Sequence, residues 1–200
     1  DIDSEAGLSG KPFGDIFGGD REFLFELGFD YEFWHGFGTA YVGASAGFVQ
    51  YLGKAVTASG GSSPDTTVLN LLPLRLGIGW AFDGLWNWLG VPLMPYAEGG
   101  FDYYFWWVLD GVGDIAVYTA EDGSESKARG GIFGAHVAVG MKVLLDALDK
   151  EAAGNLFEQV GVINSYLFAE YCWSFIDQFG SGNHFDLGDD TVMFGLAMEF

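Results

Sequence analysis

Residues 22–33 read EFLFELGFDYEF and alternate large apolar side chains with mainly acidic ones. The odd-numbered positions are all apolar: Phe23, Phe25, Leu27, Phe29, Tyr31 and Phe33. A helix, with about 3.6 residues per turn, would mix the two kinds of side chain on every face, whereas a strand places successive side chains on opposite faces. The pattern therefore predicts a β-strand with one apolar face and one polar, acidic face.

The same period of two recurs along the chain. It predicts seven strands, near 21–35, 38–52, 68–82, 94–109, 130–144, 162–177 and 189–200. Alternation over about ten residues, with apolar side chains on one face and small or polar ones on the other, is typical of strands that cross a lipid bilayer in a closed barrel. We therefore predict an all-β, antiparallel transmembrane β-barrel, with residues 1–200 as a single domain in the bacterial outer membrane.

The closing strand supports this interpretation. Its outward parity is apolar throughout and ends on an aromatic residue: Phe194, Leu196, Met198 and Phe200. A terminal Phe on an alternating strand resembles the signal by which the barrel assembly machinery recognises outer-membrane barrels. A soluble sandwich that ends in an edge strand is the alternative, and it leaves the terminal aromatic unexplained.

The amino-acid composition also bears on the class of protein. Half of the residues are hydrophobic and 18% are aromatic, yet the formal net charge is −20. A membrane helix needs about 18 consecutive apolar residues, and no run in this sequence approaches that length. No basic segment followed by an apolar one opens the sequence, so we expect no signal peptide and, for an exported protein, a processed form. Eight Lys and Arg residues argue against nucleic-acid binding, and one cysteine, Cys172, cannot form an internal disulfide.

Seven strands are one fewer than expected, because single-chain bacterial barrels have an even number and eight is the smallest common case. Residues 1–20 are rich in Gly and Asp and hold no alternating run. We therefore expect the first strand upstream of Asp1, with a strand supplied by a partner chain as the alternative.

A periplasmic carboxyl end would assign a side to each connection. Four long, polar connections are predicted to be extracellular, near 1–20, 53–67, 110–129 and 178–188. Three are predicted to be periplasmic: a short turn at 35–38 and two short helices within 83–92 and 145–161. Trp86 and Trp88 in the first of these helices are candidate interfacial anchors, as are Trp106 and Trp107 near the outer end of their strand.

The inner parity carries more acids than bases. A buried charge without a partner is unfavourable, so the sequence predicts a charge network around Arg75 that includes Glu26, Glu98 and Glu170, and a hydrogen bond from His136 to an acid. The default interpretation is structural, since side chains fill a narrow barrel. A proton- or cation-binding lumen, and hence a narrow cation channel, is the functional alternative.

The sequence also offers candidate residues for catalysis and for metal binding. His184, with Ser181 and Asp186 nearby in an outer loop, could serve a lipid-directed hydrolase, but this loop sequence is also ordinary for a turn and no G-x-S-x-G motif occurs. Candidate Ca²⁺ ligands are Asp1, Asp3 and Glu5. No EF-hand pattern is present, so solvated acidic loops are the default and no cofactor is predicted.

Several longer motifs carry a family resemblance: DIDSE, NLLPL, GVPLMPYAEGGFDYYFWWV, GVINSYLFAEY, FGSG and FGLAMEF. Together they resemble an uncharacterised outer-membrane β-barrel family of myxobacteria and related delta-proteobacteria. The resemblance spans nearly the whole chain. It implies a further strand just before the DIDSE segment and brings no catalytic residues to transfer.

The predicted function is thus a structural or protein-interaction role in the outer membrane, as a possible subunit of an envelope assembly. Expected partners are outer-membrane lipid and lipopolysaccharide, the barrel assembly machinery during biogenesis, and other envelope proteins. The alternatives are an outer-leaflet enzyme that modifies lipid A and a narrow cation channel.

Overall fold

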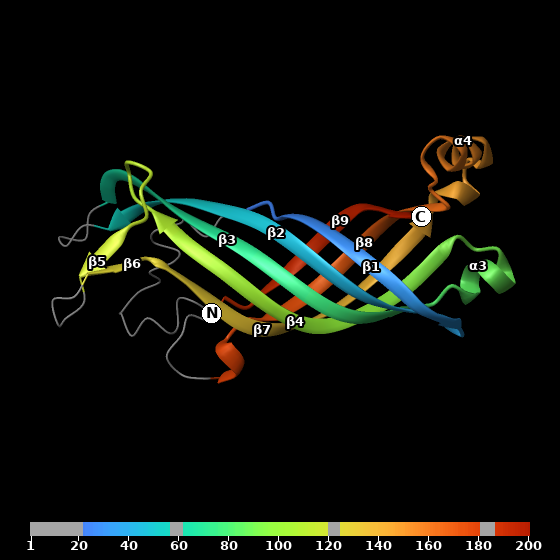
Figure 1. Cartoon of the computed structure of the whole chain (residues 1–200), viewed down its shortest axis with the longest axis horizontal. Helices are drawn as coiled ribbons and strands as arrows, with labels where there is room; N and C mark the ends of the chain where they lie inside the picture. The colour runs from blue at the N-terminus through green and yellow to red at the C-terminus, as the bar shows by residue number, and fades with distance from the viewer. Residues whose placement is uncertain (1–21, 57–61, 120–124, 181–186) are drawn as a thin grey trace.

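The computed structural model describes residues 22–56, 62–119, 125–180 and 187–200. Its main feature is one curled, antiparallel sheet in the order β1-β2-β3-β4-β7-β8-β9 (Figure 1). The strands of this sheet are β1 (Phe25–Gly36), β2 (Gly38–Val56), β3 (Ser62–Ala81), β4 (Leu93–Leu109), β7 (Arg129–Leu144), β8 (Asn164–Phe175) and β9 (Asp189–Glu199). All seven predicted strands are confirmed, with boundaries that differ by at most about six residues.

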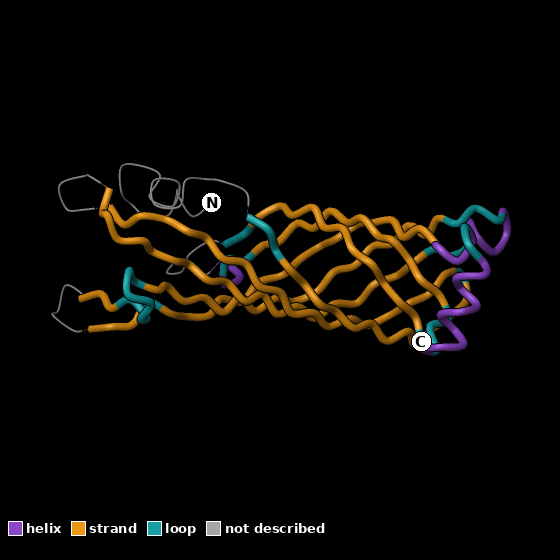
Figure 2. Tube along the Cα trace, turned by 90° about the horizontal axis from the view of Figure 1, so that it is seen from above, coloured by secondary structure: helices purple, strands orange, loops and turns teal. Residues whose placement is uncertain are grey.

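Exposure alternates along the strands as the sequence alternates. On β7, Val137 is 48% exposed and Ala138 only 2%; on β4, Phe101 is 70% exposed and its neighbour Asp102 only 2%. The large apolar side chains therefore cover the convex face of the curled sheet, and the small and polar ones lie on its concave face. Figure 2 shows the strands of opposite walls crossing around this interior.

The two ends of the sheet differ. A small hairpin of β5 (Val117–Thr119) and β6 (Glu125–Lys127) lies at one end, whereas α3 (Gly84–Leu89), η1 (Leu145–Ala147) and α4 (Lys150–Val160) lie at the other, with the carboxyl terminus (Figures 1 and 2). We call these the loop end and the helix end. Both predicted helices are confirmed; the hairpin was not expected, because its strands are too short to show a period. A further short helix, η2 (Gln178–Gly180), follows β8. None of the described helices is long and apolar enough to cross a membrane.

Tight chain reversal at the helix end depends on glycine. β1 and β2 are separated by Phe37 alone, and Gly38 adopts a φ of +92°. Side chains with a Cβ rarely adopt such a backbone conformation. The short turn predicted at 35–38 is thus confirmed.

Large side chains fill the concave face by lying over glycines of neighbouring strands. A Cβ at Gly79 would collide with the ring of Tyr41, and a Cβ at Gly77 would collide with the carboxyl group of Glu98. Apolar clusters complete the filling: Tyr41, Ala81 and Tyr96; Val49, Leu69 and Leu71; and Tyr104, Ile132 and Ile176. The many glycines of the sequence therefore make room in the interior.

Candidate functional site

The polar interior of the sheet centres on His136 of β7. Its Nδ1 lies 2.5 Å from Oδ1 of Asp102 on β4, and its Nε2 lies 3.5 Å from Oε1 of Glu98 on the same strand. Side-chain exposure is 2% for His136 and 0% for Asp102. The imidazole thus bridges two carboxylates, and the expected hydrogen bond from His136 to an acid is present.

A second group surrounds Arg75 of β3. Its Nη1 lies 3.1 Å from Oε2 of Glu26 on β1 and 3.9 Å from the sulfur of Met193 on β9, while Nη2 donates to the hydroxyl of Tyr104 at 3.2 Å. The buried Nε has no hydrogen-bond partner in the described part of the chain. The guanidinium group of Arg75 therefore contacts side chains of β1, β4 and β9.

The single network predicted around Arg75 is split in the structure. Glu98 contacts His136, and Glu170 accepts a hydrogen bond from the hydroxyl of Tyr96 at 2.8 Å. The register explains the split, because the cross-strand partner of Arg75 is Asp102, and Glu98 lies four residues from Asp102, about 13 Å along the strand.

Lys142 of β7 is a further basic side chain of the interior. Its Nζ lies 4.0 Å from Oδ2 of Asp30 on β1 and stands over the rings of Tyr41 and Tyr96, 5.3 and 5.2 Å from their centroids. Cation–π contacts of this kind stabilise a partly desolvated ammonium group. The sequence pattern does not predict that aromatic rings would hold Lys142.

Towards the helix end the interior carries two further carboxylates, those of Glu199 and Glu32. Glu199 of β9 accepts hydrogen bonds from the amide of Asn164 at 2.8 Å and the hydroxyl of Tyr166 at 3.1 Å. For Glu32 of β1 the nearest cationic candidate is the exposed His35, whose Nδ1 lies 3.9 Å from Oε2 of the carboxylate. Neither carboxylate is paired with a Lys or Arg side chain among the described residues.

The described residues of the interior do not form a nucleophilic catalytic site. Ser174 of β8 is the cross-strand partner of His136, which would suit a Ser-His-Asp triad. Its hydroxyl instead contacts Tyr104 and the thiol of Cys172, and Nε2 of His136 faces Glu98. Both Ser174 and His136 are buried. Within the described residues, Asp102 and Glu98 hold the imidazole, and the group fills the buried interior.

The convex face is built mainly from exposed aromatic and aliphatic side chains that gather at both ends. At the helix end Phe37 packs against Trp80, Phe82 and Trp88, with centroid distances between 5.2 and 6.0 Å. Towards the loop end Trp107 packs against Phe48 and Phe105 at 6.2 and 5.6 Å.

The four tryptophans predicted as anchors take different places. Trp86 and Trp88 of α3 and Trp107 of β4 lie on the outside, and Trp88 is 66% exposed. Trp106 instead packs against the buried clusters around Leu71 and Ile132. Its position follows from the strand itself, since Trp106 and Trp107 are consecutive and must point to opposite faces. Trp106 is therefore an interior side chain and not a rim anchor.

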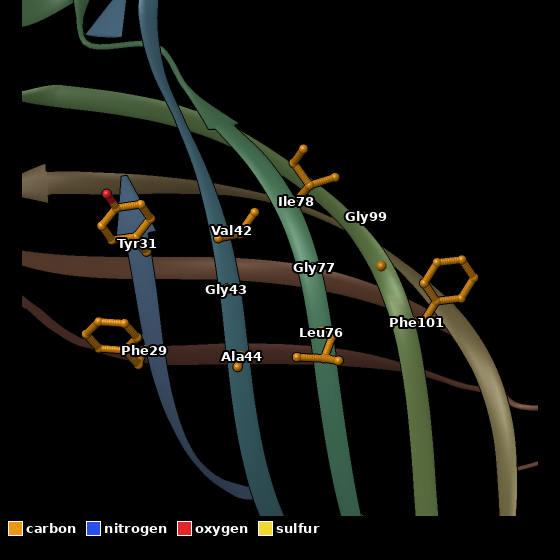
Figure 3. Close-up of a pocket in the computed structure, with 11 residues that line it drawn as sticks. Phe29, Tyr31, Val42, Gly43, Ala44, Leu76, Gly77, Ile78, Gly99 and Phe101 are labelled. Atoms are coloured by element: carbon orange, nitrogen blue, oxygen red, sulfur yellow. The ribbon is translucent and has the colours of Figure 1, made fainter. Parts of the chain in front are cut away.

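A shallow apolar depression of about 490 Å³ crosses the convex face (Figure 3). Phe29 and Tyr31 of β1 form one wall and Phe101 of β4 the other. Its floor is made by smaller residues of the strands between them: Val42, Gly43, Ala44, Leu76, Gly77, Ile78, Gly99 and Gly100. The side chains predicted to point outward from the closing strand are also exposed: Phe194, Leu196, Met198 and Phe200.

Two groups of predicted site residues fall outside the described residues. They are the candidate catalytic set His184, Ser181 and Asp186, and the candidate Ca²⁺ ligands Asp1, Asp3 and Glu5. Within the ranges that the structure describes, no cluster of three or more His, Cys, Asp or Glu side chains is arranged to hold a metal ion.

Comparisons with protein-family models, curated proteins and solved structures find no match to this chain. The resemblance to the myxobacterial barrel family therefore stays a prediction.

Proposed function

We propose that this chain forms most of an integral outer-membrane β-barrel of eight strands, with a structural or protein-interaction role in the cell envelope. The observation that carries the proposal is the convex face, where large apolar side chains are exposed along every strand of the sheet and aromatic rings gather at both ends. In water such a surface would be a liability, whereas in a bilayer it is the surface that faces lipid.

The spacing of the two aromatic groups supports a bilayer. Trp107 is the cross-strand partner of Asn70 on β3, and Trp80 lies ten residues further along β3. Ten residues of strand span about 33 Å, which at the usual tilt of a barrel strand corresponds to a height of about 25 Å. This height matches the apolar band of outer-membrane barrels, which is flanked by aromatic girdles.

The depression in Figure 3 fits the same environment. Its lining is apolar and open to the outside, which suits contact with lipid acyl chains. The interior supports a structural role, because Arg75, Lys142 and His136 each stand against carboxylates and buried side chains fill the space between them. The loop end and the helices α3 and α4 remain available to partner proteins.

The test is purification of the native protein from outer membranes. We expect the protein to stay with the membrane pellet after an alkaline carbonate wash, to require detergent for release, and to migrate faster on a denaturing gel before boiling than after it. Release by carbonate alone would contradict the barrel.

Mass spectrometry of the detergent extract then tests the role. A stoichiometric protein companion would support the interaction role and direct mutagenesis to its contact surface. A barrel that purifies alone, together with lipid A whose acylation changes only when the barrel is present, would replace this role with that of a lipid-modifying enzyme.

A further inference from the structure

Helix α4 has one apolar side, and the large side chains of that side are exposed. Leu156 and Phe157 precede Val160 by four and three residues, which places all three on the same side of the helix. They are 37, 60 and 60% exposed, respectively, and no residue of α4 is buried. The opposite side carries Glu151 and Glu158. Because an amphipathic helix usually turns its apolar side towards a core, this stripe calls for a contact outside the chain.

Both ends of α4 are held at the rim of the sheet. Before the first turn, Oδ1 of Asp146 accepts hydrogen bonds from the backbone N–H and the hydroxyl of Ser165 on β8, at 3.1 and 2.5 Å. After the last turn, Gly161 ends the helix with a φ of +77°, and the N–H of Ile163 donates to the carbonyl oxygen of Glu199. The helix therefore has a defined place beside β8 and β9.

This place lies beside the wall of the curled sheet. In Figure 1 α4 lies outside the outline of the sheet, next to the carboxyl end of β9. Figure 2 shows it running across the long axis of the sheet at the helix end. If the strands cross a bilayer, a helix in this place runs along the membrane surface and does not cover the opening of the interior.

The apolar surface of the sheet continues into this helix. Ile163, which connects α4 to β8, and Leu167, on the outward side of β8, are both about half exposed. Met198 of the neighbouring strand is 54% exposed, and Phe200 at the end of the chain is 75% exposed. The stripe of α4 thus extends the convex face that we propose to face lipid.

A lipid surface fits this stripe better than a partner protein does. Specific protein interfaces usually bury about 800 Å² on each partner, and three partly exposed side chains supply only a fraction of that area. A helix that the barrel already holds at the membrane needs no such area. Interfacial helices bind anionic lipid through Lys and Arg on their polar side, whereas the polar side of α4 bears Glu151 and Glu158. These charges favour headgroups without a net charge.

We infer that α4 lies flat in the headgroup layer of the leaflet at the helix end and binds zwitterionic lipid by inserting Leu156, Phe157 and Val160. Its acidic side faces water, where partner proteins can reach it. The inference rests on the proposed barrel and adds a second membrane contact beside the strands.

Spin-label accessibility tests this placement in the full-length protein in phosphatidylcholine vesicles. A nitroxide is attached to one introduced cysteine at a time, with Cys172 replaced by Ala. Collision of the nitroxide with oxygen, which concentrates in lipid, is compared with its collision with a neutral, water-soluble nickel chelate. We expect the label of Val160→Cys to favour oxygen, at a shallower depth than that of Leu76→Cys on β3. Glu151→Cys, on the polar side of α4, is the matched control and should favour the chelate.

The label at Leu76 separates this inference from the proposed barrel. If it favours oxygen while the label at Val160 favours the chelate as strongly as the one at Glu151, α4 lies in water and only this inference fails. A label at Val160 that neither reagent reaches would mean that protein covers the stripe, which would also overturn the inference. Preference for the chelate at Leu76 would refute the membrane barrel, and this inference with it.

Charge variants test the contact itself. Loss of one buried Phe side chain shifts such an equilibrium by about tenfold or more, so Phe157→Asp should make the label at Val160 more accessible to the chelate. Asn155→Asp adds the same charge on the polar side and should leave that accessibility unchanged. An equal response to both substitutions, or to neither, would overturn the insertion of the stripe.

Lipid charge tests the choice of headgroup. Replacing part of the phosphatidylcholine with phosphatidylglycerol should raise the accessibility of the label at Val160 to the chelate, because Glu151 and Glu158 are repelled by the anionic surface. Unchanged or reduced accessibility would refute the preference for zwitterionic lipid.

Discussion

His136 of β7 and Asp102 of β4 meet on a diagonal between adjacent strands, and each stands opposite a glycine of the other strand. Gly100 is the cross-strand partner of His136, and Gly134 is the partner of Asp102. A Cβ at Gly100 would press against the imidazole. Gly100 therefore gives the imidazole room to come within 2.5 Å of Asp102, in a region where both side chains are almost fully buried.

Replacement of His136 with Leu should strongly destabilise the protein. Oδ2 of Asp102 already lacks a hydrogen-bond partner among the described residues, and the substitution would also remove the partner of Oδ1. Leaving a buried carboxylate alone typically costs about 3–5 kcal/mol. Equilibrium unfolding in urea, with the protein in lipid vesicles and tryptophan fluorescence as the signal, measures the loss.

The matched control is the double variant His136→Leu with Asp102→Leu. Replacing both partners of a buried pair with apolar residues is often nearly neutral, so the double variant should be more stable than the single one. A single variant that unfolds at the same urea concentration as the wild type would show that the pair contributes little.

Much of the sheet could be predicted because its signal is local. The alternation in residues 22–33, 189–200 and the five segments between them specifies both the strand and its outward face, and observed exposure follows that parity. Because successive side chains of a strand point to opposite faces, the sequence alone determines which residues share a face. The two helices at the helix end were also predictable from short apolar runs between strands.

Contacts inside the sheet could not be predicted in the same way. Parity places Arg75, Glu98 and His136 on one face, but which of them touch depends on the register between strands. Register sets Asp102 beside Arg75 and moves Glu98 towards the helix end, so the expected single network becomes separate groups. Lys142 over Tyr41 and Tyr96 is likewise a consequence of register and curvature, which no single segment of sequence contains.

Glycines beneath large side chains should be sensitive to the smallest added group. Gly79→Ala would push a methyl group into the ring of Tyr41, which is buried against Ala81 and Tyr96. Overpacking of this kind costs roughly 1–3 kcal/mol, and urea unfolding in vesicles should show it.

Gly99→Ala is the corresponding control, because a Cβ there would make only an ordinary contact with the carbonyl oxygen of His136, at 3.6 Å. It should leave the stability within about 0.5 kcal/mol of the wild type. Equal losses at Gly79 and Gly99 would contradict the packing described here.

The thiol of Cys172 should report whether the interior is closed. Cys172 is fully buried on the concave side of β8, next to Ser174, and a buried thiol is inert towards alkylating reagents. We expect no mass increase when the folded protein is treated with a maleimide-polyethylene glycol reagent, and complete modification after unfolding in denaturant. Rapid modification of the folded protein would indicate a water-filled path to Cys172, and would favour a channel over a filled barrel.

A charge on the convex face distinguishes a membrane barrel from a soluble sheet. Leu76 of β3 is 65% exposed and lies in the middle of the apolar band, on the floor of the depression in Figure 3. In water, Leu76→Arg at such an exposed position should change stability by no more than about 0.5 kcal/mol. In a bilayer the same change should cost about 2–4 kcal/mol, because the guanidinium would be placed near the hydrocarbon midplane.

The control is Val112→Arg, at a position that is 85% exposed in the turn after β4, beyond the end of the sheet. Unfolding in urea from lipid vesicles should separate the two variants by at least about 1.5 kcal/mol, with Val112→Arg close to the wild type. Bilayer depth is the cause of the expected difference, so it should also shrink as the substitution is moved from Leu76 towards Trp80, next to the aromatic group at the helix end. Equal stability of the Leu76 and Val112 variants would mean that the convex face does not lie in lipid, and the exposed apolar rows would then have to be covered by protein.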